Sequence, residues 1–218
     1  MTGLYYSFDK EKGFVTGPLG NRGYMLECAK AKGDNSLVEA DEELGIKSIH
    51  VNLSVVQCIQ SDMAEQLIQI MEKYKVPPEM LNLELTERIT LSATDLMRAH
   101  MKKLSTHGVK FSLDDYGTGS SNCAYLIDYA FPMVKFDKKM MDSYFENQTA
   151  HLILENEFMT LKKLGIVIVA EGIETKEQVD RLKEINMNYI QGYFFAKPAP
   201  AAEFIKLVRE KNSEAGKQ

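Results

Sequence analysis

The chain has 218 residues, of which 44% are hydrophobic and 26% are charged, and its formal net charge is -5. This composition is typical of a soluble globular protein with one sizeable core, and the acidic balance argues against a general nucleic-acid binder, which carries a basic face. No apolar run reaches the roughly 18 residues that a membrane-spanning helix needs. The three cysteines, Cys28, Cys58 and Cys123, form no Cys-x-x-Cys pair. We therefore expect small reduced core side chains and a cytoplasmic location.

Short apolar segments alternate with amphipathic segments along the chain. The apolar segments predict strands over residues 48–53, 81–85, 109–113, 133–136, 166–170 and 189–194. Helical periodicity predicts helices over residues 62–74, 96–108, 150–164, 175–185 and 201–211. Asp62 with Glu65, and Thr175 with Gln178, have the spacing of capping boxes at two of the helix starts.

Strands that alternate with helices predict a parallel sheet, and strands that are apolar on both faces predict that helices cover both sides. Such a sheet is either open and doubly wound or closed into a barrel. No Gly-x-Gly-x-x-Gly follows an early strand, which disfavours a dinucleotide-binding open sheet. We predict one α/β domain over residues 1–218, with a frayed tail at residues 212–218.

Every predicted strand has a polar side chain at or near its C-terminal end. These residues are Asn52, Glu84 with Glu87, Asp114 with Asp115, Lys135 with Asp137, Glu171 with Glu174, and Gln191. In a barrel, the C-terminal ends of the strands meet at one mouth, where barrel enzymes carry their active sites. Six strands with this feature predict one site at that mouth.

Two adjacent carboxylates, Asp114 and Asp115, precede a loop formed by Gly117, Thr118 and Gly119. Neighbouring carboxylates repel each other, and a shared cation removes the repulsion, while glycines let the backbone turn close to a ligand. Oxygen ligands without histidine favour Mg²⁺, Mn²⁺ or Ca²⁺ over Zn²⁺. Two such ions suit the attack of water on a phosphodiester, and a lysine beside them can orient the water or stabilise negative charge.

Six motifs occur in the order typical of a known family. They are Val51-Asn52-Leu53-Ser54, Glu84-Leu85-Thr86-Glu87, Asp114-Asp115-Tyr116-Gly117-Thr118-Gly119, Lys135-Phe136-Asp137, Glu171-Gly172-Ile173-Glu174 and Gln191-Gly192-Tyr193, followed by Lys197-Pro198. Over roughly residues 48–208 the chain resembles the EAL domains, bacterial phosphodiesterases that cut cyclic di-GMP to linear pGpG. The resemblance implies a modified TIM-type (β/α) barrel, cyclic di-GMP as the ligand and a homodimer.

The resemblance also implies roles for single residues. Asn52, Glu84, Asp114 and Asp115 resemble ligands of one or two Mg²⁺ or Mn²⁺ ions. Lys135 resembles the lysine that positions the attacking water, and Glu171 resembles the proposed general base or metal partner. Asp137, Glu174 and Gln191 resemble residues that contact the substrate or water, or that support the residues making these contacts. Glu87 resembles the anchor of the loop Gly117, Thr118 and Gly119, which is associated with dimerisation in the family.

The N-terminal part departs from the family pattern, because the Glu-Ala-Leu tripeptide that names the family does not occur. Residues 5–17 resemble the hairpin that precedes it, which places Leu19-Gly20-Asn21 at the Glu-Ala-Leu position. In a second register, residues 14–28 match a later family segment, and the opening strand and first helix are absent. Both registers make residues 1–47 divergent or shortened and lose a metal-binding glutamate, and a phosphate-contacting arginine unless Arg22 replaces it. One carboxylate fewer weakens the binding of divalent ions.

Three functions are therefore compatible with the sequence. The first is a metal-dependent phosphodiesterase whose activity is weak or lost. The second is a receptor that binds cyclic di-GMP without cutting it, and the third is a dimerising signalling module. Simpler structural roles also fit single residues: Glu174 can complement a helix dipole, Asp137 can form an ion pair, and Gln191 can satisfy backbone groups. His50, two residues before Asn52, is expected to be a hydrogen-bonded histidine of the barrel interior.

Overall fold

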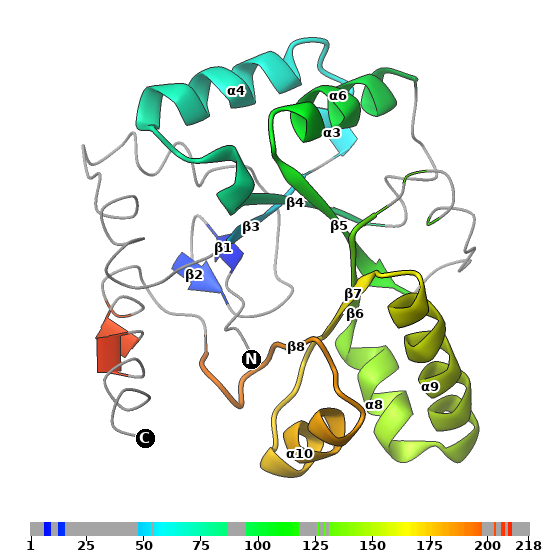
Figure 1. Ribbon diagram of the computed structural model, residues 1–218. Helices are drawn as coiled ribbons and strands as arrows, with labels where there is room; N and C mark the ends of the chain where they lie inside the picture. The colour runs from blue at the N-terminus through cyan, green and yellow to red at the C-terminus, as the bar shows by residue number, and fades with distance from the viewer. Residues whose placement is uncertain are drawn as a thin grey trace.

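The computed structural model describes residues 7–9, 13–15, 48–53, 55–86, 95–117, 126, 129, 131–197, 203, 206, 207, 209 and 210. The described strands form one eight-stranded sheet in the order β2-β1-β3-β4-β5-β6-β7-β8 (Figure 1). Their bounds are β1 Ser7–Asp9, β2 Gly13–Val15, β3 Ile49–Asn52, β4 Leu81–Thr86, β5 Lys110–Tyr116, β6 Met133–Phe136, β7 Val167–Ala170 and β8 Tyr189–Ile190.

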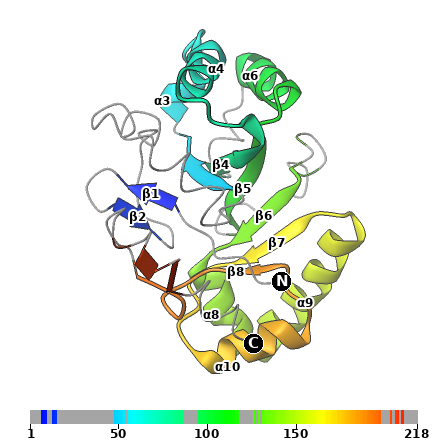
Figure 2. The same ribbon diagram turned by 60° about the vertical axis from the view of Figure 1, so that its left-hand side comes forward.

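The six strands from β3 to β8 run parallel to one another and follow each other in chain order. A doubly wound sheet reverses its strand order at one point, and this sheet does not. The strands curl into a half-barrel with the helices on the outside (Figures 1 and 2). The predicted α/β fold of the modified TIM-barrel type is therefore confirmed, and the open doubly wound alternative is excluded.

The N-terminal hairpin predicted within residues 5–17 is also present. β1 and β2 pair antiparallel with Phe8 opposite Phe14, and β1 joins the parallel sheet through Ser7 opposite His50. The segment 19–47, which includes Leu19-Gly20-Asn21 and Arg22, lies outside the described residues, as does the tail 212–218. The predictions for the opening strand and for the tail therefore stay predictions.

The helices cover the outer face of the strands in two groups. α4 and α6 lie beside β4 and β5, whereas α8, α9 and α10 lie beyond β6 and β7 (Figure 1). Their bounds, with those of the short helices, are α3 Val55–Cys58, α4 Met63–Tyr74, η1 Pro78–Met80, α6 Asp95–Thr106, α8 Lys138–Glu146, α9 Gln148–Lys163 and α10 Lys176–Glu184. Of the predicted C-terminal helix, residues 203, 206, 207, 209 and 210 are described, and all are helical.

The helix starts confirm one predicted cap and correct the other. At α10, the Thr175 side chain accepts from the backbone N–H of Gln178 and the Gln178 side chain accepts from that of Thr175, which is a complete capping box. At α4, Asp62 caps no backbone group, because its carboxylate accepts from Gln66 Nε2 at 2.6 Å. Its expected partner Glu65 instead forms an ion pair with Lys103 of α6. The capping box predicted at α4 is therefore wrong.

Strand side chains alternate between the two faces of the sheet, so the alternating apolar residues of a strand share one face. Leu83 and Leu85 of β4 and Phe111 and Leu113 of β5 are buried in one hydrophobic cluster with the helices. Cys58 is also buried there, as predicted, whereas Cys28 and Cys123 lie outside the described residues. None of the helices described is long and apolar enough to cross a bilayer.

Candidate functional site

A buried cluster of opposite charges lies inside the half-barrel. The ammonium Nζ of Lys135 is 2.7 Å from Glu84 Oε1, 3.1 Å from Asp114 Oδ1 and 2.7 Å from Glu171 Oε1. Lys135 is 2% exposed and Glu171 is 0% exposed. Charged side chains are almost never fully buried unless they are paired, so these four residues form one ionic unit.

The cluster follows from strand alternation and register. Glu84 and Asn82 alternate with leucines on β4, and Asp114 and Ser112 alternate with apolar residues on β5. The Ser112 hydroxyl donates to Asn82 Oδ1 at 2.9 Å, which shows that these alternate positions face each other. Lys135 takes the corresponding position on β6.

Glu171 comes directly after β7, and its backbone N–H donates to the carbonyl of Phe136 at 3.0 Å. This bond carries the β6–β7 pairing one residue further and places the Glu171 side chain beside Lys135. The four charged groups of the cluster therefore come from four neighbouring strands of one parallel sheet, near their C-terminal ends.

An irregularity in β5 accompanies the Asp114–Asp115 pair. Leu113 pairs with Val134, but the next pair joins Tyr116 to Phe136, so β5 has one more residue than β6 in this interval. Asp115 adopts a left-handed backbone with φ 53°. A bulge of this kind changes the direction of side chains and often lies beside a functional site. Asp115 is half-buried at this bulge, and Gly117, which has φ 89°, ends the strand.

The cluster contains three acids for one ammonium. The Lys135 ammonium and the hydrogen bond from His50 lower the pKa of Glu84 to about 2, against the opposing effect of its burial. Burial raises the pKa of Asp114 to about 6 and that of Glu171 to about 8. The three carboxylates together hold the pKa of Lys135 well above its ordinary value. Without a further cation, the excess negative charge is relieved by keeping Glu171 protonated near neutral pH.

The donor chemistry of the cluster fits a hard divalent cation. Glu171 Oε2 is buried and has no hydrogen-bond partner among the residues described, and three carboxyl groups surround one ammonium. Oxygen donors with excess negative charge are what Mg²⁺ and Mn²⁺ bind. In the described part of the chain, no three acidic, imidazole or thiol groups are already arranged around a common metal position, since the carboxylates converge on Lys135.

His50 extends the cluster on the side of β3. It is buried, its Nδ1 is 3.0 Å from Glu84 Oε1, and its Nε2 is 3.3 Å from the hydroxyl of Ser48. The prediction of a hydrogen-bonded interior histidine is confirmed. Its contact with Glu84 was not predicted, although the register that places Asn52 opposite Glu84 also puts His50 two residues away on the same side of the strand.

The other predicted site residues lie at different distances from the cluster. Asn52 is half-buried at the end of β3, opposite Glu84. Gln191 is buried directly after β8, and its backbone N–H donates to Ala170 at 2.8 Å. Asp137 caps α8, accepting from the backbone of Met140 at 2.9 Å. The Glu174 side chain is 48% exposed and pairs with Lys138 at 3.2 Å. Glu87, Thr118 and Gly119 lie outside the described residues.

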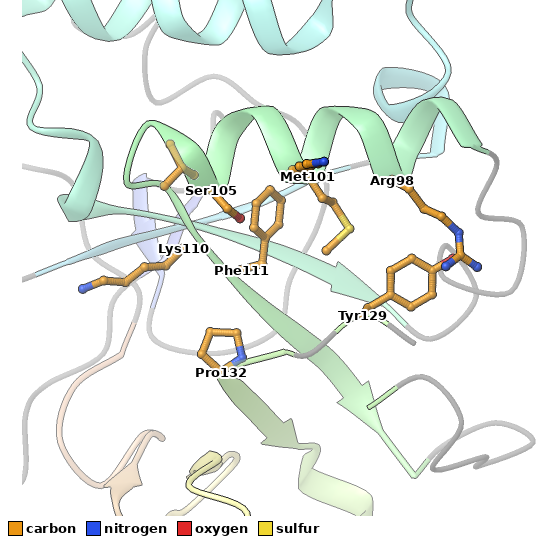
Figure 3. A pocket seen from close by; sticks show the side chains of 9 residues that line it. Arg98, Met101, Ser105, Lys110, Phe111, Tyr129 and Pro132 are labelled. Carbon is orange, nitrogen blue, oxygen red and sulfur yellow. The ribbon is translucent and has the colours of Figure 1, made fainter. Parts of the chain in front are cut away.

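A surface cavity of about 360 Å³ lies away from this cluster, between α6 and the N-terminal ends of β5 and β6 (Figure 3). Phe111 lies beneath α6, Arg98 stacks at 4.6 Å on the ring of Tyr129, and Lys110 lies at the opposite end of the cavity. Its charged side chains do not converge on one point. The buried cluster around Lys135 is therefore the better candidate for chemistry.

Comparison with known sequences gives a consistent result. The EAL domain family profile matches residues 26–198. The chain is 31% identical over 157 residues to the cyclic di-GMP phosphodiesterase PdeL of Escherichia coli, and the aligned region covers 72% of this chain and 43% of PdeL. It is 29% identical over 167 residues to the signaling protein YkoW of Bacillus subtilis, and the aligned region covers 77% of this chain and 21% of YkoW. The chain thus spans less than half the length of either relative.

Solved structures share the fold. The EAL enzyme Bd1971, in its form bound to cAMP and cyclic di-GMP, superposes with a TM-score of 0.74 at 25% identity, over 84% of this chain and 49% of that one. The manganese and cyclic di-GMP complex of Klebsiella pneumoniae BlrP1 gives a TM-score of 0.69 at 25% identity, over 81% of this chain and 44% of that one.

Proposed function

We propose, from the premise that this chain belongs to the EAL domain family, that it hydrolyses cyclic di-GMP to linear pGpG with Mg²⁺ or Mn²⁺ bound at the barrel mouth. The observation that carries the proposal is the buried cluster of Glu84, Asp114 and Glu171 around Lys135. Burying three carboxylates costs free energy, and a structural role alone does not require such an arrangement.

The metal ions would be held by Asn52, Glu84, Asp114 and Asp115, with Glu171 as a further acidic partner. Bound divalent ions supply a nucleophilic water at neutral pH and neutralise charge on the phosphodiester. Asn52 opposite Glu84, and Asp115 beside Asp114 at the β5 bulge, support this ligand set. The orphaned Oε2 of Glu171 supports a cation on that side of the cluster.

Lys135 and Glu171 would carry the proton and charge chemistry. Lys135 stays charged beside the carboxylates, so it can orient the attacking water and stabilise the charge that develops on the phosphate. Burial raises the pKa of Glu171 to about 8 without a metal, and a bound divalent cation would favour its ionised form, which would then accept a proton from that water. Water adds across one phosphodiester bond of the cyclic dinucleotide, and the ring opens to pGpG.

The remaining predicted residues have supporting roles in this proposal. Buried Gln191 would contact the ligand or the water from the end of β8. Asp137 holds α8 in place directly after Lys135, and Glu174 pairs with Lys138 at the rim. Glu87 and the loop of Gly117, Thr118 and Gly119 would form a homodimer contact, which light scattering of the purified chain tests.

The direct test is incubation of the purified chain with cyclic di-GMP and Mg²⁺ or Mn²⁺, with pGpG measured by chromatography. We expect pGpG to form, to disappear with EDTA and to fall to background in Glu171→Gln. Lys176→Gln, on the outer surface of α10, is the matched control and should retain full activity. Product formation that is equal in the wild type and in Glu171→Gln would contradict the proposal.

A receptor function is the second candidate, and the absence of the Glu-Ala-Leu tripeptide favours it. A lost carboxylate weakens metal affinity but leaves the ligand pocket. Calorimetric binding of cyclic di-GMP by a chain that forms no pGpG would identify this function. Absence of binding would exclude it.

A further inference from the structure

His50 contacts the cluster through an oxygen that Lys135 also contacts. Both His50 Nδ1, at 3.0 Å, and Lys135 Nζ, at 2.7 Å, meet Oε1 of Glu84. His50 is 1% exposed, and it comes from β3, whereas Lys135 comes from β6. Two donors from different strands therefore hold the same carboxylate oxygen.

The hydrogen bonds define which nitrogen of His50 carries the proton. An ionised Glu84 is an acceptor only, so Nδ1 must be the donor. In the neutral ring with its proton on Nδ1, Nε2 is an acceptor. The hydroxyl of Ser48, 3.3 Å from Nε2, then donates to it. Ser48, His50 and Glu84 thus form a directed chain of hydrogen bonds that ends on Oε1.

This chain has a consequence for the second oxygen of Glu84. A carboxylate whose Oε1 is held by two donors cannot rotate without breaking both contacts. Neither of these contacts involves Oε2. Groups that fix a metal-binding carboxylate in this way raise metal affinity, because the ligand is already oriented before the ion arrives.

We infer that His50 is a positioning residue: together with Ser48 it orients Glu84 so that Oε2 is presented to the metal ion. The inference rests on the proposed function, since it takes Glu84 as a metal ligand. It adds a residue outside the six motifs, on the β3 side of the barrel.

The test measures Mn²⁺ affinity by calorimetry and by electron paramagnetic resonance of free Mn²⁺, without any nucleotide. We expect His50→Leu to weaken Mn²⁺ binding by about 10- to 100-fold, the range found when partners of metal ligands are removed. His50→Asn should restore most of the affinity, because the Asn amide can donate from a position close to that of Nδ1. Ser48→Ala should weaken binding less than His50→Leu does.

His100 provides the matched control. It is also a buried histidine with one hydrogen bond, from Nε2 to the carbonyl of Gln60 at 2.8 Å, but it lies on α6. His100→Leu should lose stability and keep wild-type Mn²⁺ affinity. Nuclear magnetic resonance of the wild-type His50 ring should show the proton on Nδ1, as the hydrogen-bond chain requires.

The outcomes separate two kinds of failure. If the wild type binds Mn²⁺ and His50→Leu binds it equally well, the positioning role is wrong and the metal site stands. An equal loss of affinity in His50→Leu and His100→Leu would also overturn the inference, because it would reflect stability alone. If the wild type binds no Mn²⁺, the proposed metal-dependent function fails and the inference fails with it.

Discussion

Replacing Lys135 by methionine is the most informative perturbation of the cluster. Methionine has nearly the same length and fits a buried position, but it removes the ammonium from three carboxylates that lie within 3.1 Å of it. The substitution therefore leaves Glu84 with His50 as its remaining partner among the cluster contacts described above. Glu171 and Asp114 lose the cation that faces them.

The structure gives a magnitude for this loss. Glu84 has its pKa lowered from 4.5 to about 2, which corresponds to about 3 kcal/mol of stabilisation. Because the folded pKa is the lower one, this contribution is present above the unfolded value of 4.5 and is lost only as the pH falls toward 2. The figure is close to the roughly 3–5 kcal/mol that removal of one partner of a buried ion pair costs.

The loss should grow with pH. Without Lys135, Glu84 must stay charged with less compensation or take up a proton, and keeping it neutral costs about 1.4 kcal/mol for every pH unit above its ordinary pKa. We therefore expect the free energy of unfolding of Lys135→Met to fall by about 3 kcal/mol at pH 5, and by clearly more at pH 8.

Urea unfolding followed by circular dichroism, with EDTA present, measures this difference. Lys176→Met is the control, because its side chain is 77% exposed and its ion pair with Asp180 lies on the surface. It should stay within about 1 kcal/mol of the wild type at both pH values. If Lys135→Met unfolds at the same urea concentration as this control, the ammonium does not neutralise the cluster, and the account of the site is wrong.

Three further predictions follow from the described contacts. Glu171 has its pKa raised from 4.5 to about 8, so its neutral form is preferred in the folded state, and the free energy of unfolding without metal should fall by a few kcal/mol between about pH 5 and pH 8. Urea unfolding in EDTA should show this pH dependence, and Mg²⁺ or Glu171→Gln should reduce it. The same pH dependence in Glu171→Gln would refute the assignment. Gly192→Ala places a Cβ 2.0 Å from the carbonyl oxygen of Ile173, and this overpacking should lower the free energy of unfolding by more than about 2 kcal/mol. Gly165→Ala, with φ 75° and open space around it, should lower it by about 1 kcal/mol. Equal melting temperatures for the two variants would contradict this expectation. Asp137→Ala should lower the free energy of unfolding by about 1 kcal/mol, because α8 loses its cap, and Asn147→Ala should do the same at α9. If Asp137 acts only as a cap, Asp137→Ala should leave Mn²⁺ affinity unchanged.

Much of the fold could be predicted because apolar runs and polar strand ends are local signals. The strand 133–136 was predicted with its observed bounds, and Lys135 inside it was predicted as a site residue. The capping box at Thr175 was equally local. The helix α8 was missed because it is short, and only Met141 and Tyr144 of it are buried. Asp137 before it was a helix-start signal, but it was interpreted as a site residue.

The parts of the site that were not predicted depend on register and three-dimensional geometry. Nothing local in residues 110–116 shows that β5 gains one residue against β6, so the left-handed Asp115 could not be anticipated. The contact of His50 with Glu84 requires the pairing of β3 with β4. Asp62 failed as a cap because a nearby glutamine competes for its carboxylate, and sequence spacing does not measure that competition.

The chain-order arrangement of β3 to β8 affects how the protein can be made. Each new strand can add to the edge of the strand that left the ribosome before it, without waiting for a distant segment. Glu84 and Asp114 emerge before Lys135, so the lysine meets its counter-charges as soon as β6 docks. Glu171 then arrives last, against a cation that is already in place. We expect the order of synthesis to spare every intermediate from burying an uncompensated lysine.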